Sequence, residues 1–329
     1  MDFQLFQGAA PARRGPARMS RSRVASDAPL SVFFHPRYWV IWIMAAALRL
    51  TVLLPYSGRV VVGDALGAAF YRLMGRRKHV ARVNLELCFP KMSAIERERL
   101  LKEHFAALGV AFVEMGAAWW ASDRKLEGLA EVKGLEHLEA ALEKGRGAIL
   151  LSAHFVFLEI GLRLFSRTMP CYMIYRPNRN PLLDRIIQNG RNRHPGEMIS
   201  RDDARSLLRA LKRNHPVWYP PDMDHGRRNS VFADFFGQPA ATVKATARYA
   251  KMSGSPVIPF YFFRKPGFRG YEIVLLPPLE DFPSGDEQKD ARRVNAVLES
   301  EIRKHPEQYL WAHRRFKTRP DANEDVYRR

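Results

Sequence analysis

The sequence predicts an α/β fold of the α+β type, in which an N-terminal membrane helix and a helical region precede a central mixed sheet flanked by helices. Three observations lead to this prediction. An apolar segment lies near the N-terminus, residues 63–125 read as helical, and after about residue 130 short apolar runs alternate with amphipathic stretches. Such alternation of strand-like and helix-like segments is typical of a sheet covered by helices.

The N-terminal part divides into a tail and an apolar segment. Residues 1–30 are rich in Arg, Ala, Pro and Ser and predict a disordered basic tail. Residues 38–54 are apolar apart from Arg49, begin with aromatic side chains and end at Pro55. This length is at the lower limit for crossing a bilayer, and the aromatic start suits a membrane interface. We therefore predict a membrane-anchoring helix within residues 31–58, either spanning the membrane or lying in its interface. A buried core helix is the alternative.

The remaining elements follow from hydrophobic periodicity. An amphipathic helix is expected over residues 93–120, where Ser93 and Glu96 have the spacing of a capping box. Apolar runs predict strands at residues 148–152, 171–175, 217–219, 257–262 and 272–276. Amphipathic stretches predict helices at residues 157–165, 181–190, 202–211, 243–252 and 290–304. We expect residues 59–320 to form one domain and residues 321–329 a tail.

The charge balance limits the partners. The chain has 53 Lys and Arg against 34 Asp and Glu, a net charge of +19, which predicts attraction to an anionic membrane, an acidic protein or nucleic acid. No zinc-finger, helix-turn-helix or RNA-recognition pattern is present, and the apolar segment also argues against a nucleic-acid partner. Cys88 and Cys171 lack metal-binding or redox spacing, so we expect buried free thiols and neither a metal nor a cofactor.

The clearest chemical signal is the segment from Gly147 to Glu159. An apolar run ends at His154, and Glu159 follows five positions later on an expected helix, from which its carboxylate can reach the imidazole. A carboxylate on one ring nitrogen fixes the tautomer and leaves the other nitrogen to take a proton from an alcohol. The alternative is a structural histidine with an unrelated glutamate, because the same spacing also occurs by chance. The surrounding residues are therefore needed to support a catalytic pair.

Other polar residues also follow strand-like runs, where α/β proteins build sites. Arg176 directly follows residues 171–175, and a guanidinium such as that of Arg176 or Arg191 can bind a phosphate through two hydrogen bonds. Asp222 and Asp224 follow two prolines and lack a third metal ligand at a suitable spacing. Surface charge for the arginines and turn formation for the aspartates are the alternatives.

These residues belong to strings that together resemble one known family. The strings are HPRYW at 35–39, NLELCFP at 84–90, HFVFLE at 154–159, YRPN at 175–178, PDMDHG at 221–226 and PEQYLWAHRRFKTRP at 306–320. They occur in order over residues 31–320 and resemble the late acyltransferases of lipid A biosynthesis. This is the lauroyl/myristoyl transferase group within the lysophospholipid acyltransferase superfamily.

The resemblance implies an acyltransferase domain over residues 59–320 and a reaction for it. A fatty acyl chain, with the lauroyl type favoured, would move from acyl carrier protein to a 3-hydroxyacyl chain on a Kdo-bearing lipid A precursor. His154 would act as the base and Glu159 would orient it. The substrate-binding group would be Arg176, Arg191, Asp222 and Asp224. The expected partners are acyl carrier protein, the phosphorylated lipid A precursor and the membrane, with the active site on the cytoplasmic side of the inner membrane.

Two related activities remain open. One is another lysophospholipid acyltransferase that takes its acyl group from acyl carrier protein or from acyl-CoA. The other is an acyl thioester hydrolase, in which the same base would activate water in place of an acceptor hydroxyl. A serine esterase is disfavoured because the chain has no Gly-x-Ser-x-Gly motif.

Overall fold

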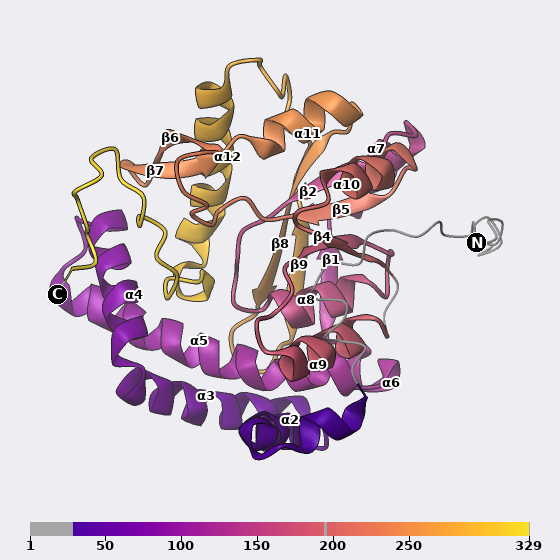
Figure 1. The fold of residues 1–329 in the computed structure, drawn as a ribbon, viewed down its shortest axis with the longest axis vertical. Helices are drawn as coiled ribbons and strands as arrows, with labels where there is room; N and C mark the ends of the chain where they lie inside the picture. The colour runs from indigo at the N-terminus through magenta and orange to yellow at the C-terminus, as the bar shows by residue number, and fades with distance from the viewer. Residues whose placement is uncertain (1–28, 194–195, 329) are drawn as a thin grey trace.

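The computed structural model describes residues 29–193 and 196–328, so the tail predicted for residues 1–30 lies almost wholly outside the described residues. Helices α2 to α5 form the lower part of the molecule in Figure 1, and the sheet with its flanking helices stands on them. The helical elements are η2 Leu30–Phe34, η3 Pro36–Tyr38, α2 Trp39–Thr51, α3 Tyr56–Leu73, α4 Gly75–Cys88, α5 Ala94–Trp120, α6 Asp123–Leu126, α7 Leu135–Glu143, α8 Leu158–Phe165, α9 Pro181–Arg191, α10 Ala204–Lys212, α11 Ala245–Ser253, α12 Glu287–Lys304 and η4 Pro306–Gln308. The strands are β1 Ala130–Lys133, β2 Ala148–Leu151, β3 Tyr172–Tyr175, β4 Met198–Ser200, β5 Pro216–Tyr219, β6 Ser230–Phe235, β7 Gln238–Val243, β8 Val257–Arg264 and β9 Tyr271–Leu275.

The predicted central mixed sheet flanked by helices is confirmed. The sheet has seven strands in the order β1-β9-β8-β2-β5-β3-β4. Strands β8, β2, β5, β3 and β4 are parallel to one another. Strand β9 is antiparallel to β8, and β1 is parallel to β9. The central strand β2 is buried at every position, as expected for a strand with parallel neighbours and helices on both faces. The carboxyl ends of five strands therefore meet at one edge of the sheet.

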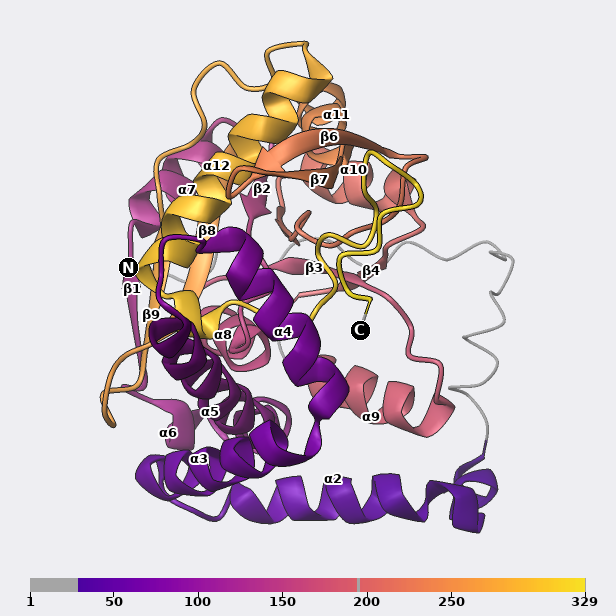
Figure 2. The same cartoon turned by 90° about the vertical axis from the view of Figure 1, so that its left-hand side faces the viewer.

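The helix that we predict within residues 31–58 is present but shorter than the apolar segment at residues 38–54. Residues 30–51 fold as two 3-10 turns and the 13-residue helix α2, and a new helix, α3, begins directly after Pro55. Proline disfavours helical geometry in the preceding residue, which explains the break between α2 and α3. Among the described residues, no helix combines the length and the apolar character that crossing a membrane requires. Figure 2 shows α2 along one side of the molecule, with α3 and α5 between it and the sheet.

Helix α3 packs on α5 through glycines that let the two backbones approach closely. A Cβ atom at Gly109 would lie only 2.2 Å from the carbonyl oxygen of Gly63, and one at Gly67 would lie 2.4 Å from the carbonyl oxygen of Phe105. Larger residues at these positions would push the helices apart. The capping box predicted at Ser93 is confirmed at the start of α5, which orients this long helix beneath the sheet.

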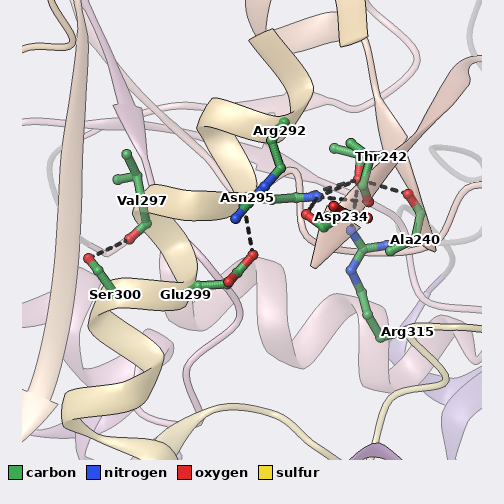
Figure 3. A network of polar contacts seen from close by, with 10 residues as sticks. Asp234, Ala240, Thr242, Arg292, Asn295, Val297, Glu299, Ser300 and Arg315 are labelled. Carbon is green, nitrogen blue, oxygen red and sulfur yellow. Dashed lines mark hydrogen bonds and ion pairs between the residues drawn. The ribbon is translucent and has the colours of Figure 1, made fainter. Parts of the chain in front are cut away.

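A second, two-stranded sheet lies against α12 and was not predicted. Strands β6 and β7 form an antiparallel hairpin, and Figure 3 shows the polar network that fastens it. Asn295 on α12 donates a hydrogen bond to the Asp234 carbonyl at 2.9 Å and to the hydroxyl of Thr242 at 3.0 Å. The buried Arg315 guanidinium donates to the Ala241 carbonyl at 2.8 Å and to the Thr242 hydroxyl at 3.0 Å. The network thus fixes the segment after η4, which runs next to His154.

The C-terminal boundary predicted at residue 320 also differs. Tyr327 is buried in the main core, where its hydroxyl donates to the side-chain oxygen of Asn84 at 2.6 Å and accepts from the Phe316 backbone N–H at 3.0 Å. The chain is therefore anchored on the domain at Val326 and Tyr327, whereas residues 321–325 and Arg328 are exposed. A lone tyrosine in a polar stretch gives no periodicity from which this packing could be read.

Candidate active site

The register between β2 and β5 brings His154 and Asp222 together. The two strands are parallel, and Leu151 lies opposite Tyr219 at their carboxyl ends. His154 and Asp222 each come three residues after these positions, so the chain leaves both strands side by side. The imidazole Nδ1 lies 2.6 Å from Oδ1 of Asp222, and the backbone N–H of His154 donates to Oδ2 at 3.0 Å.

Asp222 is buried and ionised. Burial by itself would raise the pKa of its carboxyl, but the charge and hydrogen bonds of His154, together with the charge of Arg315, lower this pKa to about 2. A carboxylate only accepts hydrogen bonds, so we assign the imidazole proton to Nδ1. The Nε2 atom is then the basic nitrogen of the ring. An orienting carboxylate with a general base requires this geometry.

The structure corrects the expectation that Glu159 orients His154. The carboxylate of Glu159 accepts a hydrogen bond from the indole N–H of Trp119 at 3.1 Å. It also accepts two from Arg191, one from Nε at 3.2 Å and one from Nη2. Among the described residues, it has no hydrogen bond with the imidazole of His154. Glu159 lies in the first turn of α8, as expected, but the cation of Arg191 on α9 and the indole N–H of Trp119 on α5 bind its carboxylate there. The local pairing in sequence is replaced by a long-range one with Asp222.

The two arginines that we singled out have different surroundings. The guanidinium of Arg191 grips Glu159 and lies over the ring of Tyr175 at 5.3 Å, so its fork is already engaged. Arg176 is exposed at the carboxyl end of β3, on the same sheet edge as His154. The structure therefore places Arg176 where a substrate can reach it and places Arg191 in an ion pair behind Glu159.

Asp224 fastens the loop after β5 to the C-terminal segment. Its carboxylate accepts from the backbone N–H of Thr318 at 2.6 Å, from the Thr318 hydroxyl at 2.8 Å and from the N–H of Gly226 at 2.8 Å. These donors belong to the loop after β5 and to the C-terminal segment, so the carboxylate joins the two. Asp224 thus holds the loop that carries Asp222, and its role in shaping the pocket stays a prediction.

His313 is a site residue that the sequence analysis did not single out. Burial lowers the pKa of its imidazole to about 4, and Asp222 and His154 are among the groups whose charges act on it. The segment that carries it is joined to His154 directly, because the Leu310 N–H donates to the His154 carbonyl at 3.0 Å. The only sequence signal for His313 was its place within the string at residues 306–320.

An apolar groove of about 620 Å³ lies beside this centre, within the range of about 300–1,000 Å³ that is usual for sites that bury small ligands. Three of its lining side chains are polar: Arg77, Glu159 and His313. The other lining residues are Phe70, Met74, Phe105, Leu108, Ala111, Phe112, Met115, Val156, Leu158, Leu310 and Ala312. The shape and lining suit a flexible hydrocarbon chain.

The comparisons with known proteins agree with this chemistry. Residues 30–318 match the model of the bacterial lipid A biosynthesis acyltransferase family. The chain is 41% identical over 293 residues to the lipid A biosynthesis lauroyltransferase of Escherichia coli, covering 89% of this chain and 96% of the relative. It is 40% identical to the palmitoleoyltransferase of the same organism, covering 90% and 96%. It is 30% identical to the E. coli myristoyltransferase, covering 90% and 93%. The chain belongs to the bacterial lipid A biosynthesis acyltransferase family and is an acyltransferase.

Proposed function

We propose that this protein transfers a fatty acyl chain from acyl carrier protein to the hydroxyl of a 3-hydroxyacyl chain on a Kdo-bearing, phosphorylated lipid A precursor. The observation that carries the proposal is the ionised Asp222 on the imidazole of His154, at the edge of an apolar groove. The names of the relatives support lipid A as the acceptor class. The net charge of +19 suits an acidic carrier protein and a phosphorylated lipid.

In the proposed reaction, Nε2 of His154 takes the proton of the acceptor hydroxyl while its oxygen attacks the carbonyl carbon of the thioester. The tetrahedral intermediate collapses, the C–S bond breaks, and the imidazolium returns the proton to the departing thiolate. Asp222 stabilises the imidazolium between these steps, because its carboxylate is held 2.6 Å from Nδ1. Ester and thiol are the products, so atoms and charge balance.

Glu159 keeps a place in this proposal, with a changed role. It lines the groove, and its charge is neutralised by the guanidinium of Arg191. We propose that the Glu159–Arg191 ion pair forms a rigid part of the groove wall next to the thioester. Arg176 remains the candidate for acceptor phosphate, and Asp224 supports the Asp222 loop. We favour a lauroyl-type donor because the string HPRYW at residues 35–39 resembles the lauroyl branch of the family and the E. coli lauroyltransferase is 41% identical. The length of the apolar groove would then limit the length of the acyl chain.

Membrane attachment and a position on the cytoplasmic side of the inner membrane are also part of the proposal. Helix α2 exposes large apolar side chains on one side of the molecule, which suits a helix lying in a membrane interface. These side chains are Trp39, Val40, Ile43 and Leu50. Residues 65–85 contain no acidic side chain, and a basic run lies near the groove. Its cations are Arg72, Arg76, Arg77 and Lys78. Such a run suits anionic lipid headgroups.

The test is direct. The purified protein receives acyl carrier protein loaded with lauroyl thioester, with and without a lipid A precursor, and mass spectrometry follows the lipid. We expect one acyl chain to be added to the precursor and the thiol to be released in equal amount. Thioester cleavage at the same rate without an acceptor, and no change in the mass of the lipid, would instead identify a hydrolase and refute the proposed function.

A further inference from the structure

Two arginines lie next to each other at the carboxyl edge of the sheet. Strands β3 and β4 are parallel, with Tyr175 opposite Ser200. The backbone N–H of Arg201 donates to the Tyr175 carbonyl at 2.9 Å, so the last pair of the ladder is fully hydrogen-bonded. Arg176 and Arg201 directly follow this pair and therefore leave the sheet from neighbouring positions. Both side chains are exposed.

This edge is the one that carries the catalytic pair. The strand order β2-β5-β3-β4 and the parallel directions place β3 two strands and β4 three strands from the strand of His154. At about 4.8 Å per strand, the two arginines follow strands about 10 and 14 Å from the strand of the base. The charges of Arg201 and His154 both act on the imidazole of His225, whose pKa is lowered mainly by burial and is raised in part by Asp224 and Asp222.

The guanidinium forks of this pair are more available than that of Arg191. Within the described part of the chain, no hydrogen bond or ion pair engages the side chain of Arg176. Arg201 has an ion pair with Asp202 at 3.5 Å, but Asp202 is 81% exposed, and such surface pairs hold their partners weakly. Two adjacent planar forks can grip the oxygens of one phosphate together, which lysine or a single arginine does less well.

We propose that Arg176 and Arg201 form a phosphate-binding pair, which holds a phosphate group of the lipid acceptor while the acceptor hydroxyl lies at His154. This inference rests on the proposed function and adds Arg201 to the site. The same chemistry would also fit the phosphodiester on the arm of the carrier protein. The arginine pair lies at the sheet edge, on the β3–β4 side of His154. The residues that line the apolar groove, which would hold the acyl chain of the donor, come instead from α3 to α5, residues 156–159 and residues 310–313. Because the pair is not part of the groove for the donor, we favour the acceptor.

The experiment compares the variants Arg176→Gln, Arg201→Gln and Arg201→Lys with the wild type and with Arg99→Gln. Arg99 is 74% exposed on α5 and loses the same charge away from the site. Each protein is assayed with the phosphorylated lipid acceptor, with the same acceptor after phosphatase treatment, and for hydrolysis of the acyl-carrier-protein donor alone. Thermal melting checks that each variant is folded, and we expect little change because both arginines are exposed.

We expect each Gln variant to raise KM for the phosphorylated acceptor roughly tenfold or more, on the scale of one lost charge-assisted contact, with Arg201→Lys in between. The variants should equal the wild type with the dephosphorylated acceptor and in donor hydrolysis. A raised KM for the donor would assign the pair to the carrier-protein arm and overturn the acceptor assignment. Wild-type KM values in all assays, or equal losses with both acceptors, would overturn the phosphate site. If the wild type itself acylates no lipid, the proposed function fails, which is a separate outcome.

Discussion

Replacing Asp222 by Asn separates the two carboxylates that could serve His154. The change keeps the shape of the side chain but removes the charge that lies 2.6 Å from the imidazole. A hydrogen bond to a charged group contributes about 1.5–3 kcal/mol, which at about 1.4 kcal/mol per tenfold lowers the rate by roughly 10- to 100-fold. The amide can also favour the wrong tautomer, and in serine proteases the equivalent change lowers kcat by about 10⁴-fold. We therefore expect kcat to fall at least 100-fold.

The assay measures kcat for acyl transfer at saturating acceptor, for Asp222→Asn and for Glu159→Gln. If Asp222 orients the base, its variant should lose kcat with little change in KM, while Glu159→Gln should affect KM and thermal stability as well, because it leaves the Arg191 guanidinium without its partner. Wild-type kcat in Asp222→Asn would refute the assignment. A fall confined to Glu159→Gln would return the orienting role to Glu159.

The same carboxylate predicts an acid transition. In the folded protein the pKa of Asp222 is lowered from 3.8 to about 2. A lowered carboxyl pKa stabilises the fold above the unfolded value, and this contribution is lost as the pH falls from about 4 toward 2. At about 1.4 kcal/mol per tenfold change in proton affinity, it amounts to about 2 kcal/mol. Urea unfolding at several pH values should show this loss in the wild type, and the loss should be smaller by that amount in Asp222→Asn.

Other variants test the base and the groove. His154→Ala should lower acyl transfer by about 10²–10⁴-fold without changing the melting temperature by more than a few degrees, and a variant that kept most of its activity would exclude a base at this position. Ala111→Phe fills part of the groove and should shift donor preference toward shorter acyl chains, whereas Met115→Ala enlarges it and should favour longer ones. Competition between donors of different chain length, read by mass spectrometry, measures both shifts, and an unchanged product mixture in both variants would show that the acyl chain lies elsewhere.

The sequence predicted the inner strands of the sheet better than its edge strands. Strands β2, β3, β5, β8 and β9 appear within a residue or two of the predicted runs. For β2, β5 and β8 the reason is that buried strands with parallel neighbours are continuously apolar. Strands β1 and β4, on the two edges, were missed. They are three or four residues long and only partly buried, so they carry little hydrophobic signal. The N-terminal helix was placed correctly in part, but Pro55 divides it from α3.

The candidate site shows the same division between local and long-range information. His154 was found because it ends an apolar run, and Asp222 because it follows another. Their contact depends on β2 and β5 being neighbours, which no local pattern encodes. Reasoning from one sequence therefore paired His154 with the nearest carboxylate along the chain. Arg201 was overlooked for the same reason, since its position next to Arg176 follows from the register of β3 and β4.

The two carboxylates near His154 have different partners. Asp222 is buried, ionised and directed at Nδ1, so it can stabilise the imidazolium. Arg191 holds the carboxylate of Glu159 with two hydrogen bonds, so that among the described residues Asp222 is the carboxylate on the imidazole. In the proposed mechanism, the base lies between an apolar groove that suits the acyl chain and the exposed arginines of the sheet edge, which suit the acceptor. We therefore expect the hydroxyl oxygen to reach the thioester in preference to water only when the lipid occupies its own side.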